Sequence, residues 1–302
     1  MTLINTPQVI LGHNQFFGVD HLSARRGSER AAYFGDIRNI ITVIRAAQEI
    51  GGGGLMLSTH PRAIEVCDAL RRDVKLRNHI RLFPLLPYAQ KYVTKANEVG
   101  MVRAVTGTLY ESSMQDRIRL GADVIRFAVR REPVDMVRAL MSLELRMFRR
   151  LDMPVVFLHD AISDLLLGLS VPRVFEVYAS TLRKRFGARM GVATKNLPLL
   201  VQRFSQWGLE LPVVLTHVNK IGFHINPSQS AHEACLSNHE LDVMAMGTLA
   251  SGFLRPKEAA DYVLQFPSVK MVVVGASTPE HIRDSFSHYV SHASFPSSAA
   301  NN

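Results

Sequence analysis

Short apolar segments alternate along the chain with longer segments that carry apolar residues on one face. The short segments are bounded by turn-forming or polar residues. This pattern is typical of strands buried on both faces of a parallel sheet. Eight such strands are predicted, at Val9–Gly12, Gly54–Leu57, Ile80–Leu86, Val155–Leu158, Met190–Ala193, Pro212–Leu215, Val243–Ala245 and Met271–Val274.

Amphipathic segments with apolar residues three and four positions apart predict helices between these strands. The clearest are Asp36–Ile50, Arg62–Leu70, Val134–Leu151, Pro198–Trp207 and Pro279–Tyr289. Strand–helix alternation repeated eight times favours a closed parallel barrel over an open sheet. We therefore expect an α/β fold, a (β/α)₈ TIM barrel formed by a single domain over residues 1–292.

The interval between the third and fourth predicted strands is longer than one barrel repeat requires. About seventy residues separate them, so residues 91–131 are predicted to form an insertion after strand 3. Alternatively, Val124–Phe127 forms a ninth strand. Residues 293–302 are rich in Ser, Ala and Asn, and a disordered C-terminal tail is expected there.

Composition excludes two classes of protein. Of the 302 residues, 47% are hydrophobic and 20% are charged, which excludes an intrinsically disordered chain. The longest apolar runs are far shorter than the roughly 20 residues that cross a bilayer. Residues 1–18 lack the basic start and apolar stretch of a secretory signal. Cys67 and Cys235 have neither metal-ligand spacing nor a disulfide framework, which favours a reducing, cytoplasmic location.

The net charge of +9 comes mainly from scattered arginines. No run of five basic residues occurs, and no basic stretch is interleaved with aromatic residues. Dispersed charge of this kind is typical of solvated helix faces, so we expect neither a nucleic acid nor a membrane as partner. We expect a small-molecule substrate, of anionic character; the oligomeric state is left open.

Polar residues follow nearly every predicted strand. In barrels of this type the active site lies at the C-terminal ends of the strands and in the loops that follow. The catalytic candidates at these positions are His60, Tyr88, Lys91, His159, Asp160 and Lys195. The substrate-binding candidates are His13, Asn14, Arg62, His217 and Asn219.

Two small-residue turns follow the last two predicted strands and precede predicted helices. Small residues let backbone amides approach an anion, and a helix N-terminus adds a favourable dipole. The loops after strands seven and eight are the usual phosphate site of these barrels. The predicted phosphate-binding residues are Gly247, Thr248, Leu249 and Ser251 in the first turn and Gly275, Ala276, Ser277 and Thr278 in the second. Tight turns packed for steric reasons alone are the alternative.

The second half of the chain resembles the aldo-keto reductases. The resemblance lies in the segments 143–159, 191–196, 246–252 and 274–282, in that order, together with Leu11-Gly12 near the start. It implies a barrel with an NAD or NADP cofactor. His159 then matches the catalytic histidine of the family, and Asn196 lies where the family holds the nicotinamide amide. The segments 246–252 and 274–282 match the loops for the pyrophosphate and the adenosine phosphate.

The family's other catalytic groups do not match. The aldo-keto reductases use a tyrosine acid with an aspartate and a lysine, but Leu57–Ala63 holds neither a carboxylate nor a tyrosine, and Pro87-Tyr88 stands where the lysine is expected. The resemblance therefore implies an NAD(P)-linked oxidoreductase acting on a small carbonyl or hydroxyl substrate with a non-standard catalytic set. Tyr88 and Lys91 are candidates for the proton donor and its cationic partner.

Two other kinds of enzyme remain open. His13, His60, His159 and His217, with Asp160, offer imidazole and carboxylate ligands for a divalent metal, which would support hydrolysis or lyase chemistry. Lys195 at a strand end could form a Schiff base, or could hold a carboxylate or phosphate. A barrel used only for binding would have an apolar mouth, which this sequence does not predict.

Overall fold

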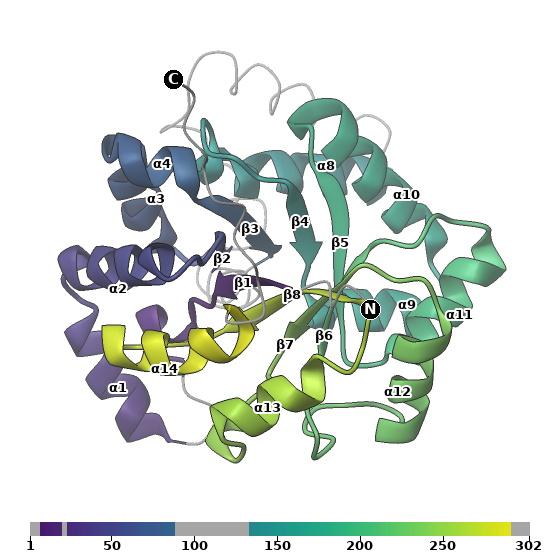
Figure 1. Cartoon of the computed structure of the whole chain (residues 1–302). Coiled ribbons are helices and arrows are strands. Elements are labelled where there is room, and N and C mark those ends of the chain that lie inside the picture. Colours follow the sequence, from purple (N-terminus) through teal and green to yellow (C-terminus); the bar gives the residue numbers. More distant parts are fainter. Residues whose placement is uncertain (1–6, 20–22, 88–132, 291–302) are drawn as a thin grey trace, which may run out of the picture. The chain divides into compact units, whose positions relative to one another are not determined.

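Eight parallel strands form a closed barrel in the order β1 to β8 (Figure 1). The computed structural model describes residues 7–19, 23–87 and 133–290. The strands are β1 Gln8–Leu11, β2 Gly54–Ser58, β3 Arg81–Leu86, β4 Val155–Leu158, β5 Arg189–Thr194, β6 Val213–His217, β7 Val243–Met246 and β8 Val269–Val274. The predicted (β/α)₈ fold is confirmed, and each predicted strand agrees with an observed one to within two residues at either end.

Helices separate the strands. They are α1 Ala24–Tyr33, α2 Ile37–Glu49, α3 Ala63–Arg72, α4 Val74–His79, α8 Pro133–Glu144, α9 Asp160–Gly168, α10 Pro172–Thr181, α11 Leu197–Trp207, α12 Gln229–Asn238, α13 Pro256–Val263 and α14 Pro279–Val290. Short 3₁₀ turns occur at Asn14–Phe17, Leu145–Phe148 and Ala250–Gly252, and a π-helical turn at Leu182–Phe186. None of the helices in the described residues is long and apolar enough to cross a membrane.

The chain divides into two compact units, which are described separately. The first comprises Met1–Gly54 and Thr216–Asn302. In it β8 pairs in parallel with both β1 and β7, and α14 lies alongside α2 (Figure 1). Asp36 caps α2 by accepting a hydrogen bond from the amide of Arg38, and Ile40 and Ile44 on the same face are fully buried.

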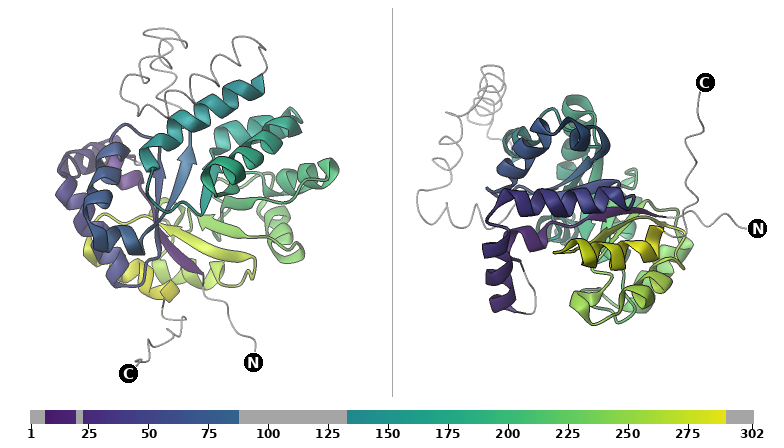
Figure 2. Two further views of the ribbon diagram at one scale, coloured as in Figure 1. Left: turned by 90° about the horizontal axis from the view of Figure 1, so that it is seen from above. Right: turned by 60° about the vertical axis from the view of Figure 1, so that its left-hand side comes forward.

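The second unit is Leu55–Leu215. In it β4 pairs in parallel with both β3 and β5, and α8 and α10 lie side by side, as the left view of Figure 2 shows. Gly191 of β5 stands opposite Phe157 of β4. A Cβ on Gly191 would collide with that buried ring, so the strand pairing requires glycine here.

Several boundaries differ from the predicted ones. The helix expected over Val134–Leu151 ends as α8 at Glu144 and continues as a 3₁₀ turn. In that turn Leu145 and Phe148, three residues apart, are both buried. The insertion at 91–131, the ninth strand at Val124–Phe127 and the tail at 293–302 lie outside the described residues.

Candidate functional site

The connection from β4 to α9 consists of one residue, His159. Its backbone is extended, and its carbonyl accepts hydrogen bonds from the amides of Ile162 and Ser163, so His159 is the N-cap of α9. Ser163 is buried and donates through its hydroxyl to the carbonyl oxygens of His159 and Ala193. The fold therefore fixes the backbone of His159 from both β4 and α9.

Three of the predicted catalytic residues are in contact in the second unit. His159 Nδ1 lies 2.7 Å from Asp160 Oδ1, and Lys195 Nζ lies 3.1 Å from Asp160 Oδ2. Lys195 follows β5, and Asp160 is the first residue of α9. The Asp160 side chain is 14% exposed, whereas those of His159 and Lys195 are 33% and 39% exposed. The carboxylate is thus largely enclosed, and its two partners reach solvent.

Two contacts make opposite demands on His159 Nδ1. The amide of Ala161 points at it from 3.2 Å and requires a lone pair, whereas the Asp160 carboxylate requires a proton. The carboxylate contact is shorter and involves a charge, so it favours a proton on Nδ1. Nε2 has no hydrogen-bond partner within the described residues and remains available to a ligand.

Asp160 is held as a carboxylate. Burial alone would raise its pKa, but the hydrogen bond and charge of His159, together with the charge of Lys195, outweigh burial and hold the pKa well below its usual value. A fixed negative charge at His159 Nδ1 orients the ring and stabilises it when it is protonated.

A second carboxylate, Asp164, lies one helical turn after Asp160 on the same face of α9. Its Oδ1 accepts from the hydroxyl of Thr194, and its Oδ2 accepts from the amide of Lys195 at 3.1 Å. Burial raises the pKa of Asp164, and these hydrogen bonds only partly oppose that effect. Asp160 therefore holds the side chain of Lys195, and Asp164 holds its backbone.

Analysis of the sequence missed Asp164 and Thr194. Thr194 directly follows the fifth predicted strand, Met190–Ala193, and the structure makes it the last residue of β5. Asp164 lies inside a helix, whereas the candidates were taken from the residues that directly follow each predicted strand. The spacing of four residues from Asp160 was the available signal.

Asn196 keeps part of its amide free. Its Oδ1 accepts from the amide of Leu199 at 3.1 Å and so caps α11. The described residues offer no partner to its Nδ2, which can still donate to a ligand.

His60 and Arg62 lie in the same unit, on the loop after β2. His60 Nδ1 accepts from the backbone amide of Arg62 at 3.2 Å. Burial lowers the pKa of His60, and the charge of Arg62 lowers it further. His60 therefore shapes its own loop, and its catalytic role stays a prediction. Tyr88 and Lys91 lie outside the described residues.

The remaining substrate-binding candidates, His13, Asn14, His217 and Asn219, belong to the first unit. The ring of His13 lies 5.5 Å from that of Phe17, and Asn14 begins the first 3₁₀ turn. Asn219 is fully buried, accepts from the amide of Phe223 and donates to its carbonyl, which occupies both ends of its side-chain amide. Asn219 thus holds a loop together, and its role in substrate binding stays a prediction.

His217 belongs to an aromatic stack. It is the last residue of β6 and not the start of the following loop. Its ring meets that of His224 edge-on at 5.1 Å, and His224 stacks on Phe223 at 4.0 Å. Gly247 has a φ of 61°, and a Cβ there would collide with the His217 ring. Local geometry therefore requires this glycine without any ligand.

The rest of the turn after β7 is internally packed. Thr248 is buried, with its hydroxyl 3.3 Å from that of Tyr289. Leu249 packs on a small apolar cluster formed by Ala250, Leu254 and Ala259. Ser251 lies in the 3₁₀ turn, and α13 begins only at Pro256, so this turn does not open a helix as expected. The steric interpretation explains this turn as well as phosphate binding does.

The turn after β8 does open a helix, α14. Its first amides are partly occupied: that of Glu280 by its own carboxylate and that of His281 by the hydroxyl of Thr278 at 3.2 Å. The ideal Cβ of Gly275 would overlap the side-chain amide of Gln15. The hydroxyl of Ser277 lies 3.4 Å from His281 Nδ1, so an anion at this turn would meet the side chains of Gln15 and His281 as well as the backbone. Ala276 is buried.

For the metal alternative, the described residues contain no group of three His, Cys, Asp or Glu side chains that could hold a metal ion. The Schiff-base alternative stays a prediction. Lys195 Nζ lies 3.1 Å from Asp160 Oδ2 and is 39% exposed.

Solved structures resemble most of the chain. A Pseudomonas aeruginosa protein described as an aldo-keto reductase has 16% sequence identity, with 95% of this chain and 91% of that chain covered and a TM-score of 0.57. MGS-M4, an aldo-keto reductase from a Medee basin deep-sea metagenome library, also has 16% identity, with 94% and 85% covered and a TM-score of 0.50. The fold is that of the aldo-keto reductases. No protein-family model matches the sequence, and no curated protein matches it.

This aldo-keto reductase-like barrel is divergent. At 16% identity the comparison shows the fold alone, because one barrel supports many reactions. The chemistry has to be argued from the His159–Asp160–Lys195 cluster.

Proposed function

We propose that the chain is an NAD(P)-linked oxidoreductase that acts on a small carbonyl or hydroxyl substrate. The observation that supports this most is the cluster of His159, Asp160 and Lys195 where β4 and β5 end, on a barrel with the fold of the aldo-keto reductases. A small anionic substrate and a cytoplasmic location are part of the same proposal.

His159 is the proposed proton-transfer group. With a proton on Nδ1 held by Asp160, Nε2 faces the substrate oxygen. In the direction of reduction the protonated ring donates from Nε2 as the carbonyl becomes a hydroxyl. Asp160 stabilises the imidazolium, and Lys195 balances the carboxylate when the ring is neutral. Asp164 keeps Lys195 in place through the backbone.

The cofactor supplies the hydride when it is bound. The Nδ2 of Asn196 fits a nicotinamide carboxamide, since it is a donor without a partner among the described residues. We propose the turn after β8, with the hydroxyl of Ser277, for a phosphate, because Gly275 is exposed and carries no Cβ, and α14 begins just after the turn, at Pro279.

The proposal is tested first by cofactor binding. Calorimetric titration of the protein with NADPH and with NADH should show saturable binding of at least one of the two cofactors. Absence of binding for both overturns the proposal. Oxidation of the bound cofactor is then assayed against small aldehydes, ketones and keto acids.

The role of His159 is tested by His159→Gln. We expect a loss of about 100-fold or more in kcat with cofactor affinity unchanged, since a proton-transfer group typically contributes 100-fold to 10,000-fold. His79→Gln is the matched control, because His79 is an exposed residue at the end of α4. Unchanged turnover in His159→Gln would remove His159 from the mechanism.

A further inference from the structure

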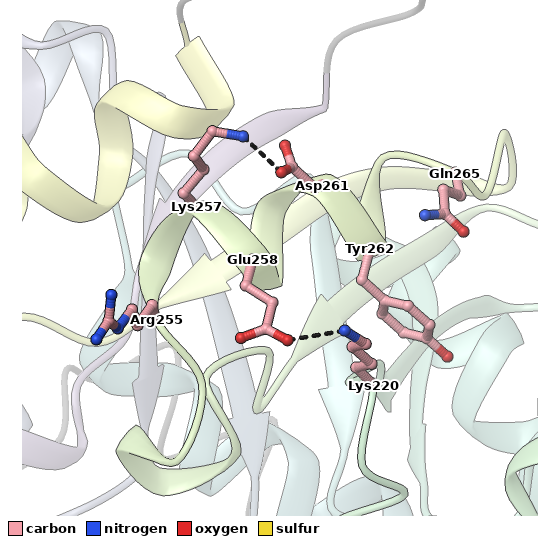
Figure 3. Close-up of a pocket in the computed structure, with 7 residues that line it drawn as sticks. All are labelled: Lys220, Arg255, Lys257, Glu258, Asp261, Tyr262 and Gln265. Atoms are coloured by element: carbon pink, nitrogen blue, oxygen red, sulfur yellow. Dashed lines mark hydrogen bonds and ion pairs between the residues drawn. The ribbon is translucent and has the colours of Figure 1, made fainter.

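A cavity of about 360 Å³ lies beside α13 in the first unit (Figure 3). It is lined by Lys220, Arg255, Lys257, Glu258, Asp261, Tyr262 and Gln265. The lining carries three cationic and two anionic side chains. The cavity therefore has one positive charge in excess and is large enough for a small organic molecule.

The charges of the cavity are paired in all but one case. Lys220 Nζ lies 2.8 Å from Glu258 Oε1, and Lys257 Nζ lies 2.7 Å from Asp261 Oδ2. Figure 3 shows these two pairs and draws Arg255 apart from them. Within the described part of the chain, the guanidinium of Arg255 has no hydrogen-bond or ion-pair partner. The excess positive charge is thus located on Arg255.

The start of α13 adds to this charge. Arg255 is the N-cap residue, Pro256 has no amide hydrogen, and no side chain caps the helix. The amides of Lys257 and Glu258 therefore lack the side-chain acceptor that usually serves the first turn. An anion held by the guanidinium would also meet the positive end of the helix dipole.

Tyr262 gives the cavity a rigid aromatic wall. Its hydroxyl donates to Glu233 Oε1 at 2.6 Å and also meets Gln229 Nε2 at 3.3 Å. Burial and the contact with Glu233 raise the pKa of Tyr262 to about 12, so the ring stays neutral. Both contacts fix the hydroxyl end, and the ring also meets that of Phe266 edge-on at 5.4 Å, so the part of the ring that lines the cavity is the part that can contact an organic group.

We propose that this cavity binds a small organic phosphate. The phosphate pairs with the guanidinium of Arg255, whose planar donors match phosphate oxygens, and the organic part lies against Tyr262. Inorganic phosphate alone is much smaller than the cavity, which is why an organic part is expected. This site goes beyond the proposed oxidoreductase activity and does not depend on it.

Phenyl phosphate is a suitable probe because it combines both features. Calorimetric titration of the full chain at constant ionic strength should give saturable binding at low millimolar concentration or below. Inorganic phosphate, which lacks the ring, should bind more weakly, and phenol, which lacks the charge, should not bind measurably.

Three variants test the assignment. Arg255→Gln should weaken phenyl phosphate binding about tenfold or more. Arg77→Gln is the matched control and should leave it unchanged, since Arg77 is an exposed arginine on α4. Glu258→Gln removes a carboxylate from the lining and frees Lys220, so it should strengthen binding several-fold. Circular dichroism confirms that each variant is folded.

Two results would overturn the proposal. One is the absence of saturable binding, or equal affinity in the wild type and Arg255→Gln. The other is a parallel loss of NADPH and phenyl phosphate affinity in Arg255→Gln, which would place Arg255 in the cofactor site. Failure of NADPH to bind, with phenyl phosphate still bound, would refute the oxidoreductase proposal and leave this site standing.

Discussion

His232 should make the protein less stable in mild acid. It lies on α12, is 1% exposed, and neither ring nitrogen makes a well-aligned hydrogen bond within the described residues. Burial lowers its pKa from the ordinary 6.5 to about 4, and the charge of Glu233 and the backbone of His217 only partly oppose this effect. The unfolded chain therefore takes up a proton that the folded chain resists.

The size of the effect follows from the two pKa values. The drop from 6.5 to about 4 corresponds to about 3 kcal/mol of unfolding free energy. Above pH 6.5 His232 is neutral in both the folded and the unfolded chain, and the unfolding free energy keeps this amount in full. As the pH falls from 6.5 toward 4, the unfolded chain is protonated first, and this part of the unfolding free energy is lost. About 2 kcal/mol should already be lost at pH 5.

Urea unfolding of the wild type and of His232→Leu, between pH 7 and pH 4.5, isolates this contribution. Leucine has a similar volume and binds no proton. Between pH 7 and pH 5, the unfolding free energy of the variant should therefore rise by about 2 kcal/mol relative to that of the wild type. His239→Leu, at an exposed position just after α12, should show no such gain. A difference between wild type and His232→Leu that stays constant across this range would refute the reasoning.

Two further predictions concern the second unit. Gly191→Ala should lower the unfolding free energy by about 1–3 kcal/mol, because its Cβ would collide with the buried ring of Phe157, whereas Gly168→Ala meets no atom within 4 Å and should have little effect in the same urea assay. Lys195→Met should raise the pKa of Asp160, since it removes one of the two side chains that hold this pKa low, and ¹³C NMR of the carboxylate would measure the rise. An unchanged Asp160 titration would show that the Lys195 contact has no electrostatic role.

Most of the fold was predictable because buried parallel strands have a simple pattern. β4, for example, was predicted with its observed bounds, Val155–Leu158, since all four of its residues are buried. The boundaries at Thr194 and His217 were less predictable. Polar residues there suggested loops, but the strands continue because backbone pairing does not depend on side-chain polarity.

The candidate site was predicted in part. The order of strands in a parallel barrel brings the residues after β4 and β5 to one edge, so His159, Asp160 and Lys195 could be grouped in advance. Asn219 looked equivalent in sequence, yet its amide is used by its own loop. The pattern of apolar and polar residues does not predict such local hydrogen bonds, because they depend on the backbone conformation of the loop.

The lengths of the connections have a consequence for how this barrel can change. One residue, His159, joins β4 to α9, and two residues, Lys195 and Asn196, join β5 to α11. Both connections are too short to absorb a change in length. Inserting or deleting a residue there would rotate the helix or displace the side chains that meet at Asp160. By contrast, residues 218–228 join β6 to α12 and can vary in length. New substrates would then be gained by lengthening or shortening the long connections, and new reactions only by exchanging side chains at the short ones.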